Sequence, residues 1–171
     1  MVNRLAVSLL FLCALPAGAE EISNPFIDYE GFQRNVAEVA VLRNTHRVSE
    51  EEFIRMAKDA DTVILDARSA GKFQLLHVKG ARNLSLPDVT AEELAKVIPS
   101  KTTRVLIYCN NNFENEQKAF ATKAAPASLN VYTKNVLYSY GYTNVYELAP
   151  LIDIRKAKLE FEGSRRVAAL R

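Results

Sequence analysis

Apolar residues recur every three or four positions in several segments of this chain, which predicts amphipathic helices. Two of these segments carry a start signal. Ser49 is followed three residues later by Glu52, and Thr90 by Glu93, and each pair forms a capping box. Helices are expected over 28–43, from Ser49, over 90–98, at the start of 118–132, over 135–140 and, on the surface, within the tail at 151–171.

Short apolar runs lie between the predicted helices and indicate strands. "TVILD" at 62–66 and "RVLIYC" at 104–109 are apolar at almost every position, as in strands that are covered on both faces. "ARNLSL" at 81–86 and "TNVYEL" at 143–148 add two more. This alternation of strands and helices predicts an α/β fold with a mostly parallel sheet.

The first residues have the pattern of a secretory signal peptide. A single basic residue, Arg4, precedes an apolar run from Leu5 to Leu15, and Ala17-Gly18-Ala19 is a small-x-small cleavage site. The alternative is an uncleaved anchor, but the run is short for crossing a bilayer. We therefore expect residues 1–19 to be removed after Ala19. The protein would then be periplasmic or secreted, without stable membrane insertion.

Composition and charge narrow the classes of function. The chain has 171 residues, which suggests one main domain, and its formal net charge of +2 gives no electrostatic case for binding nucleic acid. Two distant histidines, His46 and His77, and no clustered cysteines predict no metal site. No glycine-rich loop suggests a nucleotide, so we expect no cofactor.

Cys109 is the candidate for chemistry. It ends the "VLIYC" run, and sites in open α/β sheets form beyond the carboxyl ends of strands. Loss of Cys13 with the signal peptide leaves Cys109 alone, so it is buried and inert, paired between chains, or reactive. If the following loop wraps the sulfur and leads into a helix, backbone N–H groups and the helix dipole would stabilise a thiolate. Asparagine also tolerates the left-handed conformation that such loops often need.

Three separated blocks of sequence resemble the rhodanese-like domain family. Residues 64–86 resemble its signature D-x-R-x-x-x-E-[FY]-x-x-G-H-[IV]-x-G-A-x-N-[IL]. "VLIYC" resembles the strand that presents the family's catalytic cysteine, and "GYTNVYEL" at 141–148 resembles its last helix-to-strand turn. The positions in register within the first block are Asp66, Arg68, Phe73, His77, Val78, Gly80, Ala81, Asn83 and Leu84.

The resemblance implies a parallel five-stranded sheet with helices on both faces, spanning about 47–152. An N-terminal extension at 20–46, partly helical, and a tail at 153–171 would flank it. The implied chemistry is transfer of a sulfane sulfur, with Cys109 as the nucleophile that becomes a persulfide. The implied active loop consists of Asn110, Asn111, Asn112, Phe113 and Glu114. The implied structural polar network consists of Asp66, Arg68 and His77.

The chain also departs from the family pattern. The family's usual loop is C-x-x-G-x-[RKST]. In this chain Asn112 replaces the glycine, and Glu114 stands where the family often has a cation. The signature glutamate is Lys72 and the glycine before His77 is Leu76. An insertion between Phe120 and Thr133 could cover the cysteine or shape a different pocket. The C-x5-R loop of related phosphatases is missing, which argues against phosphoryl transfer.

Three functions remain open from the sequence. The first is a sulfurtransferase or sulfur carrier, weak with thiosulfate, whose partner is a small sulfur-containing substrate or a thiol protein. The second is a catalytically inactive rhodanese-fold module that binds a partner. The third is a redox-sensing thiol protein. Reactivity of Cys109 separates the second from the others, and the product formed separates the first from the third.

Overall fold

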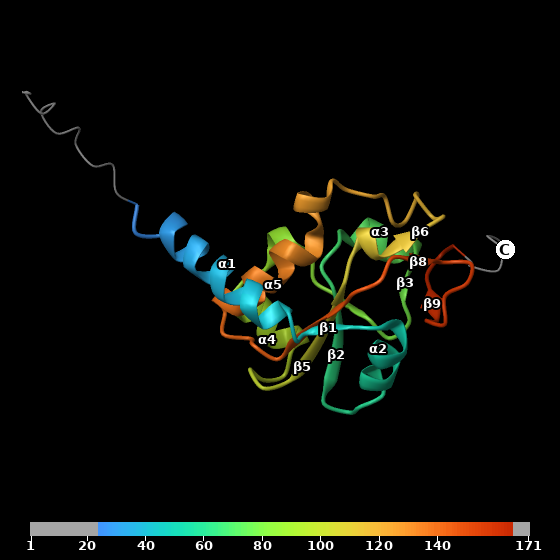
Figure 1. The fold of residues 1–171 in the computed structure, drawn as a ribbon, viewed down its shortest axis with the longest axis horizontal. Coiled ribbons are helices and arrows are strands. Elements are labelled where there is room, and N and C mark those ends of the chain that lie inside the picture. Colours follow the sequence, from blue (N-terminus) through green and yellow to red (C-terminus); the bar gives the residue numbers. More distant parts are fainter. Residues whose placement is uncertain (1–23, 166–171) are drawn as a thin grey trace, which may run out of the picture.

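Five parallel strands form the central sheet, in the order β1-β7-β5-β2-β4 (Figure 1). The computed structural model describes residues 24–165, so the signal peptide predicted at 1–19 lies outside the described residues. The expected α/β fold with a five-stranded parallel sheet is confirmed, although β4 is shorter than the strand predicted at 81–86. The strands are β1 (Arg47–Val48), β7 (Val145–Leu148), β5 (Arg104–Tyr108), β2 (Thr62–Asp66) and β4 (Arg82–Asn83).

Helices cover both faces of this sheet because successive strand residues point to opposite sides. On one face, α2 (Glu50–Ala57) packs Phe53 and Met56 against Ile64 and Leu106. On the other face, α4 (Ala91–Val97) and α5 (Leu129–Ser139) bury side chains against the odd-numbered residues of β5. The predicted caps are present, since the Ser49 and Thr90 side chains accept hydrogen bonds from the N–H groups of Glu52 and Glu93.

The helix predicted over 28–43 is α1 (Tyr29–Arg43), which packs against α5 and projects beyond it (Figure 1). Its last residue, Arg43, makes a two-bond ion pair with Glu147 of β7, with Nε 2.6 Å from Oε2. Val39 is buried, whereas Phe26 and Tyr29 at the start are exposed. Within residues 24–165, no helix combines the length and apolarity that a membrane crossing needs.

The segment between β5 and α5 differs from the prediction. The helix expected near Lys118 is wrong, because a short turn, η2 (Asn110–Asn112), leads into the strand β6 (Phe113–Glu114), and the next regular element is η3 (Ala125–Ala127). Ala119 and Phe120 are fully buried, and the Ala119 carbonyl accepts a hydrogen bond from Arg68 instead of from a helical neighbour. The helix predicted to continue through 135–140 is α5 (Leu129–Ser139), which begins within the segment 118–132.

The surface helix predicted within the tail is also wrong. Residues 152–165, here called the C-terminal strap, form β8 (Ile152–Asp153), parallel to β6, and β9 (Phe161–Glu162), antiparallel to β3 (His77–Val78). Ile154 and Leu159 are buried in the core cluster that contains Phe53 of α2. The strap closes against α3 (Ala70–Leu75) at Gly163, where φ is +142° and a β-carbon would lie 2.5 Å from the Leu75 carbonyl oxygen.

Candidate active site

Cys109 follows β5 directly and lies at the start of α5. Its Sγ atom is 3.3 Å from the Oγ atom of Ser128, the residue that precedes the first turn of α5. The Ser128 hydroxyl makes no capping hydrogen bond to that helix, so it is available to the sulfur. The sulfur therefore meets one hydroxyl and the positive end of an eleven-residue helix, both of which favour a negative charge. The residue is almost completely buried, with 1% of its surface exposed.

The helix next to the sulfur, α5, does not directly follow the turn η2 that comes after Cys109. The turn η2 leads into β6, and the chain returns to the sulfur only at Ser128. Its three asparagines do not use the left-handed conformation that the sequence suggested. Among the described residues, Asn115 is the one non-glycine residue with a positive φ, of 68°. Two of the asparagines of η2, Asn111 and Asn112, instead stabilise the site through hydrogen bonds of their side chains.

Asn112 uses the full hydrogen-bonding capacity of its amide. Its Oδ1 accepts from the N–H of Cys109 at 2.9 Å and from Nδ2 of Asn130 at 3.1 Å. Its Nδ2 donates to the carbonyls of Leu148, at 2.7 Å, and Pro150, at 3.2 Å. A side-chain amide has two acceptor and two donor positions, so Asn112 is saturated. It ties the backbone of the cysteine to the end of β7.

The other loop residues have separate positions. Asn111 pairs with the backbone of Lys123 through two hydrogen bonds, of 2.8 and 2.9 Å, and so closes the base of the insertion. Asn110 is buried beside a pocket of about 370 Å³. Phe113 is buried in the core, 5.2 Å from the ring of Phe161 in the strap. Glu114 is exposed on β6; the hydrogen bond from Arg155 to Asp153 raises the pKa of Arg155, and the charge of Glu114 adds a smaller contribution.

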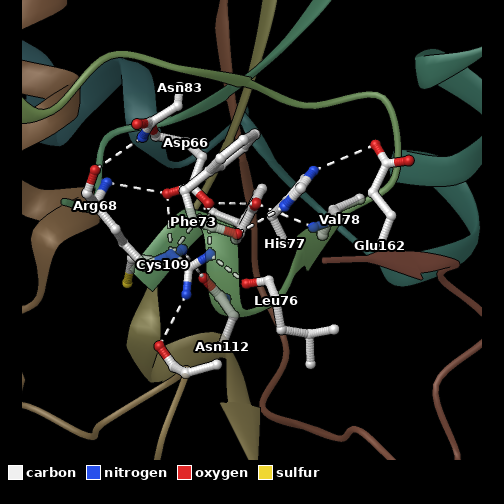
Figure 2. A network of polar contacts seen from close by, with 12 residues as sticks. Asp66, Arg68, Phe73, Leu76, His77, Val78, Asn83, Cys109, Asn112 and Glu162 are labelled. Atoms are coloured by element: carbon white, nitrogen blue, oxygen red, sulfur yellow. Dashed lines mark hydrogen bonds and ion pairs between the residues drawn. The ribbon is translucent and has the colours of Figure 1, made fainter. Parts of the chain in front are cut away.

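Asp66 and Arg68 form a buried ion pair at the end of β2 (Figure 2). Nη2 of Arg68 lies 2.6 Å from Oδ2 of Asp66, and the guanidinium also donates to the carbonyls of Leu76 and Ala119. Burial acts to lower the pKa of Arg68, but the hydrogen bonds that it donates to Asp66 raise the pKa above its usual value. The Tyr108 hydroxyl donates to Asp66 at 2.5 Å, and burial raises the pKa of Tyr108 well above its ordinary value. Because these donors are engaged internally, Arg68 is occupied with structural contacts.

His77 bonds on the other side of this network. Its Nδ1 lies 2.8 Å from the Phe73 carbonyl and its Nε2 3.2 Å from Oε1 of Glu162 in the strap, with the Phe73 ring stacked on the imidazole (Figure 2). His77 makes no hydrogen bond to Arg68 in this network. The two are connected through Leu76, the residue before His77, whose carbonyl accepts a hydrogen bond from Arg68. The structure therefore brings Asp66 and Arg68 together and places His77 at the junction of α3 and the strap.

The sequence analysis missed Ser128 and Asn130. Ser128 could have been noticed as a helix N-cap residue before the apolar pattern of α5, but the prediction gave that helix no starting residue. Asn130 is 3% exposed, and its Oδ1 atom is buried without a hydrogen-bond partner, beside the saturated amide of Asn112. Over residues 24–165, no group of three or more histidine, cysteine or acidic side chains is placed to hold a metal ion.

Comparisons with known proteins agree with this architecture. The model of the rhodanese-like domain matches residues 49–150, which is more than half of the chain. The BH2092 protein from Bacillus halodurans is similar in structure, with a TM-score of 0.50 and 16% identity, covering 79% of this chain and 85% of that one. Thiosulfate sulfurtransferase from Pseudomonas aeruginosa has a TM-score of 0.50 and 19% identity, covering 77% of this chain but 23% of that chain. At such identities the two structures share the fold. No curated protein matches the chain.

Proposed function

The chain belongs to the rhodanese-like domain family, and we propose that it carries sulfane sulfur as a persulfide on Cys109, as a sulfurtransferase or sulfur carrier. One observation carries the proposal: the sulfur at the carboxyl end of β5 is 3.3 Å from the Ser128 hydroxyl at the start of α5. A hydroxyl donor and a helix N-terminus stabilise a thiolate, which is the nucleophilic form of cysteine.

In the proposed reaction, the Cys109 thiolate attacks the outer sulfur of a donor persulfide, R–S–SH. A new S–S bond forms on Cys109 while the S–S bond of the donor breaks, and its electron pair leaves with R–S⁻. The negative charge passes to the leaving thiolate, the proton stays on the transferred sulfur, and no external oxidant or reductant is needed. A second thiol then removes the sulfur by the same exchange and regenerates Cys109.

Two features support a donor other than thiosulfate. The turn after Cys109 carries amides and the exposed Glu114, and Arg68 is held by Asp66 and backbone carbonyls. A dianion beside the sulfur would therefore lack a cation in the turn, and a nearby carboxylate would repel it. We propose a small persulfide or a thiol protein partner as donor and acceptor. On the basis of the predicted signal peptide, we also propose that this exchange occurs in the periplasm or outside the cell.

The burial of Cys109 favours a second candidate, a rhodanese-fold module that binds a partner without sulfur transfer. A thiol that is 1% exposed needs movement of the insertion before a donor reaches it. A redox-sensing thiol has the same requirement and differs in its product, which would be an oxidised sulfur or a mixed disulfide.

The test is the intact mass of the mature protein after incubation with glutathione persulfide and, separately, with thiosulfate. Gain of one sulfur atom, removed by dithiothreitol and missing in C109S, is the expected result with the persulfide. Loading by thiosulfate should be much slower. A native protein whose Cys109 neither gains sulfur nor reacts with iodoacetamide until it is unfolded would contradict the proposal and leave the binding module.

A further inference from the structure

The pocket beside Cys109 carries two lysines and no acidic side chain. We propose that it binds the carboxylate of a small persulfide donor through Lys72 and Lys123. This inference rests on the proposed function, since it names the class of donor that reaches Cys109. The turn after Cys109 has no cationic side chain, and in this proposal Lys72 and Lys123 at the pocket supply the positive charge instead.

The position of the pocket links it to the sulfur. Asn110 and Leu129 both line it, and these are the residues that directly follow Cys109 and Ser128. Cys109 and Ser128, whose sulfur and hydroxyl are 3.3 Å apart, are therefore the chain neighbours of two residues of the pocket wall. For transfer, the wall at Asn110 and Leu129 would have to move so that the sulfur of a bound donor reaches Cys109.

The lining has the character of a site for a small organic anion. Its apolar part comes from the end of β2, from η1 (Leu86–Asp88) and from the insertion, and Ser69, Ser85 and Asn110 add hydrogen-bonding groups. The volume of about 370 Å³ is near the lower end of the range for ligand pockets. It therefore suits a molecule between an amino acid and a short peptide in size, and not a folded partner.

The charge of the lining is positive. Arg68, Lys72 and Lys123 are its charged residues, and the guanidinium of Arg68 is neutralised by Asp66. The Lys72 ammonium donates one hydrogen bond to the Lys118 carbonyl, which leaves two of its three donors for a ligand. Lys123 is exposed at the rim, and its backbone is held by Asn111. The two ammonium groups thus come from α3 and from the insertion.

The positions of the two lysines favour ligands whose negative charge lies several bonds away from the transferred sulfur. Thiosulfate has its charge on atoms next to the transferred sulfur, which would place it against the amide-rich turn. A thiol persulfide with a carboxylate several bonds away can put the carboxylate at the rim and its outer sulfur toward Cys109. The lysines then hold the part of the donor that leaves as the thiolate R–S⁻, and the S–S exchange itself is unchanged.

The experiment compares two donors that differ only in charge, the persulfides of 3-mercaptopropanoate and of 3-mercaptopropanamide. Initial rates of Cys109 loading are measured by mass for the wild type, K72Q/K123Q and the control K79Q. Lys79 is an exposed lysine outside the pocket and pairs with Glu160. We expect the wild type and K79Q to load about tenfold faster from the acid than from the amide, which corresponds to about 1.4 kcal/mol. The double variant should lose this preference, so that the acid and the amide load it at similar rates, and salt should weaken the preference of the wild type.

A second measurement does not depend on sulfur transfer. Unreactive 3-(methylthio)propanoate and its amide are titrated into the wild type, and shifts of the backbone NMR signals of Ser69, Ser85, Asn110 and Leu129 are followed. Shifts with the acid alone, lost in K72Q/K123Q, would support the pocket even if Cys109 took up no sulfur, in which case the proposed function fails. Equal loading from both donors together with no acid-specific shifts would overturn this inference and leave the sulfur carrier intact.

Discussion

The sulfur of Cys109 and the hydroxyl of Ser128 are in contact at 3.3 Å although 19 residues separate them in the chain. The segment between them, residues 110–127, includes the first part of the insertion and is held by two hydrogen bonds between the Asn111 side chain and the backbone of Lys123. The two side chains therefore come from opposite ends of this segment. Its fold, and not the local sequence of the turn, sets the surroundings of the thiol.

The first prediction concerns Ser128. In S128A the thiolate loses a hydroxyl donor, and a hydrogen bond to a charged group contributes on the order of 1.5 kcal/mol or more. We expect iodoacetamide alkylation of Cys109 at pH 7 to slow about tenfold in S128A. S128T keeps a hydroxyl and should retain most of the rate. An equal alkylation rate in S128A and the wild type would show that Ser128 only fills space.

The second prediction concerns Asn112, which makes four hydrogen bonds between η2, α5 and the end of β7. N112A leaves the buried N–H of Cys109 and the Leu148 carbonyl without these partners. We expect the free energy of unfolding to fall by about 2–4 kcal/mol, measured by urea denaturation. N144A is the control, because the exposed Asn144 side chain makes one bond, to the Thr102 carbonyl. A loss in N112A no greater than in N144A would contradict the role given to Asn112.

The third prediction concerns the buried ion pair. R68A would leave Asp66 charged and without its partner in the core, and would free the carbonyls of Leu76 and Ala119. The expected loss of unfolding free energy is about 3–5 kcal/mol. The exposed pair of Arg55 and Glu52 on α2 offers the comparison, since solvent screens this pair and R55A should lower the free energy of unfolding far less than R68A. Similar unfolding midpoints for the two variants would mean that the Asp66 carboxylate is neutral or solvated.

The fourth prediction concerns Lys134 of α5, which is 4% exposed and whose Nζ atom has no hydrogen-bond partner. Burial lowers its pKa from 10.5 to about 8, against the attraction of Glu147 and with a smaller lowering from Arg43. Between these two values the unfolded chain binds more protons than the folded chain, so stability rises with pH across that window. Below about pH 8 the cost of burying the ammonium is fully present.

K134M should therefore be more stable than the wild type at pH 7, by about 1–2 kcal/mol, and should lack this part of the rise from pH 8 to 10.5. The measurement is the difference in urea-unfolding free energy between wild type and variant at each pH, which removes the other groups that titrate there. K156M, at an exposed lysine, is the control. A constant difference across the window would contradict the lowered pKa of Lys134.

The sequence predicted correctly those helices and strands that depend on neighbouring residues in the chain. The strands at 62–66 and 104–109 are apolar on both faces because helices cover both sides of the sheet. The caps at Ser49 and Thr90 need only a residue three positions away. The apolar run at 104–109 is therefore enough to predict Cys109 at the end of β5.

The features that could not be predicted depend on distant partners. The strap has apolar residues at 152, 154, 159 and 161, but charged residues between them suggested a surface helix. Its strand β9 exists because it pairs with Val78, which is 83 residues away. The segment at 118–123 has good helix formers, yet Phe120 is buried under the guanidinium of Arg68, 4.2 Å from the ring centroid. Tertiary contacts override helix propensity at both places.

The C-terminal strap also bears on how the protein acquires its fold as it is made. Leu159 and Ile154 complete a core cluster that begins with Phe53, so the face of the sheet that α2 covers stays partly open until the ribosome has passed residue 159. A nascent chain stopped earlier would contain the strands of the sheet but an incomplete interior. Completion of this core is thus a late event in synthesis, because its last members come from the strap.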